Sequence, residues 1–351
     1  MTKLRVLVID DSAYNRQTIS EILNSHPEIE VVGKAYDGEE GLKLVAQLKP
    51  DLVTLDIEMP RMDGFTFLRI VMSKMPTPVI VVSSHSRKQE VFQALELGAL
   101  DFIAKPQHHI APDIANIREE IIAKALTVKA LQPIPFSRIS LTTPSRGDVR
   151  ADYDKPRSNL EATRLVCVGA STGGPPALES LFKAMGTSPQ CAFLVAQHMP
   201  AKFTRAFAER LNRMTSLDIR EAEDGMEVYG GSVYIAPGGK HMELAKTSKQ
   251  LILKLVDVVE TDRYVPSIDR LFASAASSFE MSMLGVILTG MGADGAAGVR
   301  VVRQAGGRTI AESQESSIVF GMPKEAIQTG CIDETLPLGQ IIERIAKFAS
   351  P

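Results

Sequence analysis

Apolar and polar positions along the chain form blocks that predict strands and helices in alternation. Short apolar runs occupy residues 4–9, 29–35, 52–55, 79–82 and 102–104. Between these runs, apolar residues such as Ile19, Ile22 and Leu23 recur at the spacing of one helix face. Five apolar strands separated by helices predict an α/β domain with a doubly wound, flavodoxin-like parallel sheet over residues 1–128.

The same alternation returns in the second half of the chain. Apolar runs occupy residues 165–168, 192–196, 232–236 and 284–288. A helical spacing follows the first run in Leu178, Leu181 and Phe182. We therefore predict a second doubly wound parallel-sheet domain over residues 161–351, Rossmann-like in its strand–helix order. Residues 129–160 are rich in proline and serine and lack periodicity, which predicts a semi-extended linker.

Composition narrows the classes of function. A length of 351 residues is typical of two domains, and a net charge of −3 gives no electrostatic footprint for nucleic acid. No apolar run approaches the roughly 20 residues of a membrane helix, so we expect no direct membrane insertion. The amino-terminal apolar run is short and ends in two aspartates, unlike a signal peptide, which favours a cytoplasmic protein. The three cysteines form no CxxC pair, so neither a disulfide framework nor a zinc site is expected.

Charged and hydroxyl side chains follow the strands predicted in the first domain. Asp10 and Asp11 follow the first strand, Asp56 the third, Ser83 the fourth and Lys105 the fifth. Ligands of open parallel sheets bind outside the carboxyl ends of the strands. Carboxylates that converge there repel one another unless a cation joins them, and their hard oxygens suit Mg²⁺. The lysine and serine can then neutralise and bind an incoming anion.

These residues, with the segment LDIEMPRMDG around Asp56, resemble the response-regulator receiver family. The resemblance implies that Asp56 accepts a phosphoryl group from a histidine kinase. It implies a set of Mg²⁺ ligands: Asp10, Asp11, Asp56 and the backbone carbonyl of Glu58. It also implies that Ser83 and Lys105 sense the phosphate, and that Phe102 occupies the position of the switch aromatic without a hydroxyl group.

A glycine-rich turn dominates the second domain. The spacing Gly169-x-Ser171-x-Gly173 between a strand and a helix fits a nucleophile elbow, in which a strained turn exposes a serine hydroxyl. Such a turn is also typical of loops that cradle phosphate with backbone N–H groups. This stretch alone leaves a nucleophile and a nucleotide-binding loop equally open.

Two further residues make the nucleophile the better hypothesis. Ser171, His198 and Asp294 each follow a separate apolar strand, so in a parallel sheet their loops open on one edge. The histidine can take the serine proton, and the carboxylate can orient the imidazole. The loop 290–292 is suited to point backbone N–H groups at an oxyanion.

Three residues compete for these roles. His241 also follows a strand and a glycine turn, so it is an alternative base. Asp269 is an alternative to Asp294. Thr172 is an alternative nucleophile, although we favour a role in positioning the substrate.

The segments GASTGG, LVAQHMP, IAPGGKH, PSIDRLF and LTGMGADG resemble the CheB-type methylesterase family. The resemblance implies a triad of Ser171, His198 and Asp294, with the backbone of Met291 near the oxyanion and no cofactor for the hydrolase. It implies a phosphorylation-activated enzyme of bacterial chemotaxis that demethylates receptor glutamates and deamidates receptor glutamines, and whose unphosphorylated receiver covers the active site. The implied partners are methyl-accepting chemotaxis receptors and the chemotaxis histidine kinase, and we expect a monomer.

Two functions from other classes remain as alternatives. One is a receiver joined to a nucleotide-binding module that uses residues 169–174 as its phosphate loop. The other is a scaffolding regulator, which would tolerate Ser171→Ala. Neither accounts for His198 and Asp294 at matching strand ends, so the hydrolase is our hypothesis.

Overall fold

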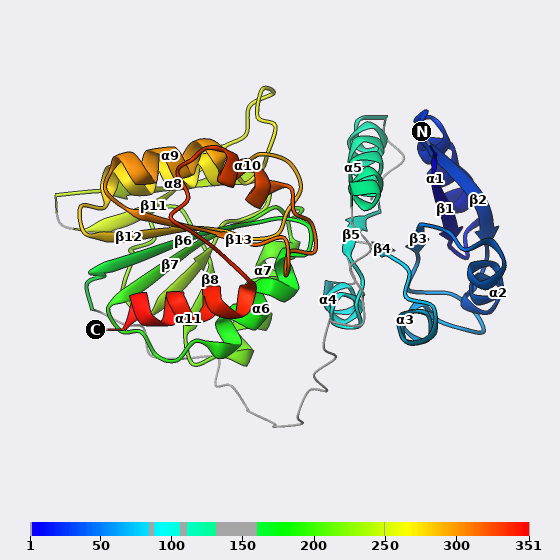
Figure 1. Ribbon diagram of the computed structural model, residues 1–351, viewed down its shortest axis with the longest axis horizontal. Helices are drawn as coiled ribbons and strands as arrows, with labels where there is room; N and C mark the ends of the chain where they lie inside the picture. The colour runs from blue at the N-terminus through cyan, green and yellow to red at the C-terminus, as the bar shows by residue number, and fades with distance from the viewer. Residues whose placement is uncertain (1, 84–87, 106–110, 131–159, 249, 351) are drawn as a thin grey trace. The chain divides into compact units, whose positions relative to one another are not determined.

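The computed structural model describes residues 2–83, 88–105, 111–130, 160–248 and 250–350. The chain divides into two compact units, Met1–Ser145 and Arg146–Pro351, which are described separately (Figure 1). The boundary between the units falls within residues 131–159, outside the described residues. The linker therefore stays a prediction, although the last helix of the first unit continues to Ala130, beyond the predicted domain end at residue 128.

The first unit has five strands and five helices among its described residues. The elements are β1 Leu4–Ile9, α1 Ala13–Asn24, β2 Ile29–Ala35, α2 Gly38–Leu48, β3 Leu52–Leu55, α3 Gly64–Lys74, β4 Val79–Ser83, α4 Lys88–Glu96, β5 Asp101–Ala104 and α5 Ala111–Ala130. All strands pair in parallel in the order β2-β1-β3-β4-β5. This order confirms the flavodoxin-like fold.

The strand order of this sheet reverses at β1 and β3, so their carboxyl ends border a crevice. Asp10 follows β1 and Asp56 follows β3 directly. The apolar cores of β1, β3, β4 and β5 are buried on both faces, which explains why continuous apolar runs marked them in the sequence.

The second unit is larger. Its elements are β6 Arg164–Ala170, α6 Gly174–Ala184, β7 Cys191–Gln197, α7 Phe203–Met214, β8 Asp218–Glu221, β9 Ser232–Ile235, β10 Lys240–Lys246, β11 Leu251–Asp257, α8 Ile268–Ser278, β12 Ser282–Ile287, α9 Ala296–Gln304, β13 Arg308–Glu312, α10 Met322–Gln328, β14 Glu334–Leu336 and α11 Leu338–Ala349. Seven strands form one parallel sheet in the order β14-β13-β12-β6-β7-β9-β8.

Helices cover both faces of this sheet, as the prediction of a doubly wound domain requires. Helices α6, α7 and α11 lie on one face, and α8, α9 and α10 lie on the other (Figure 1). Strands β12, β6 and β7 are neighbours near the middle of the sheet. The loops that carry the predicted triad therefore leave three adjacent strands at the same edge.

One supersecondary element was not predicted. Strands β10 and β11 form an antiparallel two-stranded sheet outside the parallel one, with His241 opposite Val256. Only three residues of β10 and one of β11 are buried, and charged residues interrupt the apolar residues of both strands. This hairpin packs against α8 and precedes the loop that leads into that helix.

Candidate active site and phosphorylation site

Ser171 lies in the tight turn between β6 and α6. Its N–H donates to the carbonyl of Thr289 (3.0 Å), and its own carbonyl accepts from the N–H of Gly174 (2.8 Å). Gly173 has a φ of +78°, a left-handed conformation that glycine adopts without the steric cost of a Cβ atom. Pro175 and Pro176 then occupy the first turn of α6, where their missing N–H groups cost nothing. The turn leaves the half-buried serine at the carboxyl end of the sheet.

His198 follows β7 and lies beside this turn. Its N–H donates to the carbonyl of Ala170 (3.0 Å), which fixes the two loops against each other. Its Nε2 lies 2.9 Å from Oδ2 of Asp294, and its ring stacks on Tyr264 with 5.4 Å between centroids and 2° between planes. The contact with Asp294 occupies Nε2, so Nδ1 is the ring nitrogen suited to accept a proton.

Asp294 is buried in the loop after β12. Its carboxylate accepts hydrogen bonds from the N–H groups of Ile268 (2.7 Å) and Asp269 (3.0 Å) at the start of α8. Burial opposes its ionisation, but the His198 ring and these N–H groups outweigh burial and hold the pKa of Asp294 below its usual value. The residue is therefore an anion at neutral pH, placed to orient the imidazole.

The structure assigns other contacts to the two competing residues. His241 is fully buried, with Nε2 2.9 Å from Asp262 and Nδ1 accepting from the N–H of Ser267 (3.0 Å). Both ring nitrogens are thus engaged, which disfavours His241 as the base. Asp269 accepts from the N–H groups of Gly295 (2.9 Å) and Gly298 (2.6 Å) and so caps the start of α9.

Thr172 and the loop 290–292 lie next to the serine turn. Thr172 is buried, and its carbonyl accepts from Oγ1 of Thr289 (2.9 Å). A Cβ atom on Gly290 would lie 2.8 Å from Cβ of Ser171, so only glycine permits this approach. The N–H of Gly290 donates to the carbonyl of Val319 (3.0 Å), which commits that group to the fold. Met291 follows directly and is half-buried.

Two residues of this site carry contacts that sequence reasoning missed. Gln197 is buried, and its Nε2 donates to the carbonyls of Ser171 (2.9 Å) and His198 (3.0 Å). Tyr264 stacks on the His198 ring. The one available signal was a polar glutamine at the end of an apolar strand, because the chain offered no spacing that tied Tyr264 to the site.

The predicted acidic residues of the first unit do converge. Oxygen atoms of Asp10, Asp11 and Asp56 all lie within 4.8 Å of one another. Nζ of Lys105 lies 2.6 Å from Asp56 and 2.9 Å from Asp10. Burial raises the pKa of Asp56, although Lys105 opposes that effect. Burial also disfavours charge on Lys105, yet the two carboxylates prevail and raise its pKa.

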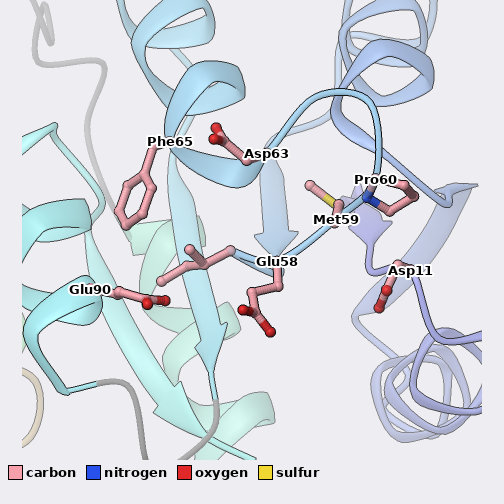
Figure 2. A pocket seen from close by; sticks show the side chains of 8 residues that line it. Asp11, Glu58, Met59, Pro60, Asp63, Phe65 and Glu90 are labelled. Carbon is pink, nitrogen blue, oxygen red and sulfur yellow. The ribbon is translucent and has the colours of Figure 1, made fainter.

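This cluster fits a hard divalent cation and a phosphoryl group. The cluster supplies carboxylate oxygens of the kind that Mg²⁺ prefers. A cavity of about 540 Å³ opens beside it, with Asp11, Glu58 and Asp63 among its lining residues (Figure 2). Oγ of Ser83 is buried and has no hydrogen-bond partner within the described part of the chain, as expected of a group that awaits a phosphate oxygen.

Phe102 is buried on β5. Nζ of Lys124 lies 5.4 Å from the centroid of its ring and donates to its backbone carbonyl (2.5 Å). The same ammonium contacts Asp101 (3.1 Å) and Glu120 (2.9 Å). The aromatic side chain is thus packed against a charged group of α5.

A search of the described helices for a membrane-crossing segment found none of sufficient length and apolar character.

Comparisons with known proteins cover both units. Residues 166–345 match the family described as CheB methylesterase, and residues 6–111 match the response regulator receiver domain. A protein-glutamate methylesterase/protein-glutamine glutaminase of Geobacter sulfurreducens is 49% identical, over 98% of this chain and 97% of the relative. A protein of the same description from Myxococcus xanthus is 48% identical, over 99% of this chain and 97% of the relative.

A solved structure supports the fold of the second unit. The catalytic domain of Thermotoga maritima CheB methylesterase is 38% identical, with a TM-score of 0.51 that covers 53% of this chain and 98% of that one. The full-length relatives and the two family matches agree with the two α/β units and their order. The chain therefore belongs to the CheB methylesterase family, with a response regulator receiver domain ahead of the methylesterase domain.

Proposed function

We propose that this protein is a phosphorylation-activated hydrolase of chemotaxis receptors. It converts glutamate γ-methyl esters to glutamate and methanol, and glutamine side chains to glutamate and ammonia. The observation that carries the chemistry is the contact of 2.9 Å between His198 and Asp294 beside the serine turn. A phosphate-binding loop would not require that pair, so the geometry favours the hydrolase over a nucleotide-binding module.

The chemistry starts at Ser171. Nδ1 of His198 accepts the serine proton as Oγ attacks the γ-carbonyl carbon, and Asp294 stabilises the imidazolium that forms. The imidazolium then returns the proton to the leaving methoxide, which departs as methanol and leaves an acyl-enzyme. Water attacks the acyl-enzyme by the same route, and glutamate and free serine result. With glutamine as the substrate, the first leaving group is ammonia.

Backbone groups complete the proposed site. The N–H of Met291 stabilises the oxyanion, and Thr172 positions the substrate. Both residues lie on loops that Thr289 ties together, since its Oγ1 donates to Thr172 (2.9 Å) and accepts from the N–H of Val319 (2.9 Å). No cofactor enters this mechanism.

The receiver supplies the regulation. Asp56 accepts the phosphoryl group from a chemotaxis histidine kinase. Asp10, Asp11, Asp56 and the Glu58 carbonyl would hold Mg²⁺, which neutralises charge during the transfer. Ser83 and Lys105 bind the phosphoryl oxygens and transmit the change together with Phe102. The unphosphorylated receiver covers the active site, and the protein acts as a cytoplasmic monomer.

Methanol release from methylated chemoreceptor membranes tests both halves of the proposal. Wild type, Ser171→Ala and Asp56→Asn are compared with and without Mg²⁺ and a small phosphodonor. We expect release that rises with the phosphodonor in wild type, is abolished in Ser171→Ala and stays low in Asp56→Asn. Release that persists in Ser171→Ala would exclude the serine mechanism, and release that ignores the phosphodonor would exclude the regulation.

A further inference from the structure

The ring of the proposed base, His198, lies against the ring of Tyr264. The two centroids are 5.4 Å apart and the two planes differ by 2°, which is an offset stack. Tyr264 lies between β11 and α8, whereas His198 follows β7, so the contact joins distant parts of the chain. The side chain of His198 is 15% exposed, so the contact is largely shielded from water.

Tyr264 is itself fixed against the loop that carries Asp294. A Cβ atom on Gly292 would lie 2.5 Å from the Tyr264 hydroxyl, so this loop packs directly on the tyrosine. The hydroxyl accepts from the N–H of Ala293 (3.4 Å), the residue before Asp294. Helix α8 begins four residues after Tyr264, and its first N–H, that of Ile268, donates to Asp294 (2.7 Å). The same loop and helix therefore hold the aromatic ring and the carboxylate.

The proposed base becomes a cation when it takes the proton of Ser171. Asp294 meets that cation at the edge of the ring, 2.9 Å from Nε2. The face of an aromatic ring attracts a cation that lies within about 6 Å of its centroid, and more strongly where water is excluded. The guanidinium of Arg263 also lies near the Tyr264 ring, 5.4 Å from its centroid. Arg263 is exposed, so water weakens its repulsion of the imidazolium.

We propose that Tyr264 is a positioning residue of the hydrolase, whose ring fixes the plane of the His198 imidazole and stabilises the imidazolium through its face. This inference rests on the proposed function and deepens it, because it adds a fourth side chain to the serine, histidine and aspartate. The positive charge appears only as the serine proton moves, so the stack stabilises the transition state more than the free enzyme. Its removal therefore lowers kcat and leaves KM nearly unchanged.

The test measures methanol release from methylated chemoreceptor membranes by the full chain, with Mg²⁺ and a phosphodonor present. Tyr264→Leu and Tyr264→Met each remove the aromatic face, and Tyr264→Phe keeps the face without the hydroxyl. Tyr229→Leu is the matched control. This half-buried tyrosine pairs with Glu161 ahead of the amino end of β6, whereas Ser171 follows the carboxyl end. Circular dichroism measures the folded fraction to which each kcat is referred.

We expect the leucine and methionine variants to lower kcat roughly 5- to 30-fold, the range of a cation–π contact shielded from water, with KM within about twofold of wild type. Tyr264→Phe should keep kcat within about threefold of wild type, because Ala293 is exposed and its N–H can bond to water instead. Tyr229→Leu should retain both constants.

A second readout does not depend on turnover. The full chain is labelled with ¹³C at Cε1 of its histidines, and the His198 signal is assigned by its loss in His198→Gln. The ring current of an aromatic side chain acts on a ring stacked against it. The His198 signal should therefore shift in Tyr264→Leu and stay near its wild-type position in Tyr264→Phe.

Three outcomes would overturn the proposal. Wild-type kcat in Tyr264→Leu would show that the ring is not needed. Equal losses of kcat in the leucine and phenylalanine variants would assign the effect to the hydroxyl group. A raised KM with unchanged kcat would place Tyr264 in substrate binding instead. Failure of the proposed function itself would give a different result, since wild type would then release no methanol or Ser171→Ala would remain active.

Discussion

Gln197 is a single side chain that links two loops of the proposed active site. Its amide donates to the carbonyls of both Ser171 and His198, so it joins the turns that carry the proposed nucleophile and the proposed base. We expect Gln197→Met to lower kcat about 10- to 100-fold, because small displacements of reacting groups are costly. KM should change little, since the amide makes no contact at the open side of the site. Steady-state methanol release measures both constants.

Two further variants separate the donor role of Gln197 from simple packing. Gln197→Glu keeps the shape but has no N–H group, so it should lose as much kcat as the methionine variant. Thr309 lies at the amino end of β13, the edge of the sheet opposite to the proposed active site. Thr309→Val removes its buried hydroxyl, which donates to the carbonyl of Cys331. That control should keep the wild-type kcat. Wild-type kcat in both Gln197 variants would refute the positioning role.

Glu312 is a buried carboxyl group behind the same loops. It accepts from the N–H of Thr289 (2.8 Å) and from Oγ of Ser316 (2.8 Å). Burial outweighs these bonds and raises its pKa. The folded state thus binds this proton more tightly than the unfolded state, so stability falls as pH rises from the unfolded pKa through the raised one. At neutral pH the ionised carboxylate is the costly form.

We therefore expect Glu312→Gln to raise the free energy of unfolding at pH 7.5 by on the order of 1 kcal/mol. The amide is neutral, and its oxygen can still accept from the Thr289 N–H. The gain should disappear as the pH approaches 4, where the wild-type carboxyl is protonated in both states. Urea unfolding between pH 4 and pH 7.5 measures this gain in the free energy of unfolding. The control is Glu334→Gln, at a more exposed position. A gain that is independent of pH would contradict the electrostatic explanation.

At the residue scale, the sequence predicted which proposed site residues follow apolar strands. Ser171, His198 and Asp294 each follow an apolar strand, and the structure brings these three loops to neighbouring strands. Gln197 and Tyr264 act through a backbone carbonyl or a ring face of another loop. Such contacts depend on side-chain directions, which no spacing along the chain encodes.

At the scale of elements, helices α8 and α9 each begin at a carboxylate that the other helix or its preceding loop supplies. Asp294 accepts from N–H groups at the start of α8, and Asp269 of α8 accepts from those at the start of α9. Asp269 uses one oxygen, Oδ1, for both of its bonds. We expect Asp269→Ala to destabilise the unit by about 1–2 kcal/mol, because the first turn of α9 loses its acceptor.

Asp269→Asn is the matched control for the cap. Its amide oxygen can replace Oδ1, and burial already disfavours the charged carboxylate by raising the pKa of Asp269. The asparagine variant should therefore unfold near the wild-type urea midpoint, while the alanine variant unfolds earlier. Equal loss in both would show that the charge, and not the acceptor, stabilises α9.

Strands were predictable from the sequence where burial is two-sided. All seven residues of β7 are buried, so an apolar run marked it to within one residue at each end. Strands β8 and β14 are the edge strands of the sheet and have few buried residues. Strand β13 is mostly buried, but its sequence RTIAE has only two adjacent apolar residues, so no apolar run marked it. The β10–β11 hairpin has only four buried residues, and charged residues interrupt its apolar ones. The length of the apolar run, and not burial alone, thus decided which strands could be found.

At the scale of the whole molecule, the two units have separate cores and separate sites. Phosphorylation at Asp56 can change catalysis only if the phosphoryl group interacts differently with an active and an inactive arrangement of the chain. If the receiver covers the active site, residues 160–351 alone should already be in the active arrangement. The solved catalytic domain of Thermotoga maritima, of which 98% aligns here, indicates that such a fragment folds.

We expect the fragment 160–351 to release methanol at or above the rate of the phosphorylated full chain, and to ignore the phosphodonor. The unphosphorylated full chain should be slower by roughly 5- to 150-fold, the range of a coupling free energy of about 1–3 kcal/mol. Ser171→Ala in the same fragment controls for contaminating esterases. A fragment that is folded by circular dichroism but inactive would mean that the receiver completes the active site, because removal of a simple cover cannot abolish catalysis.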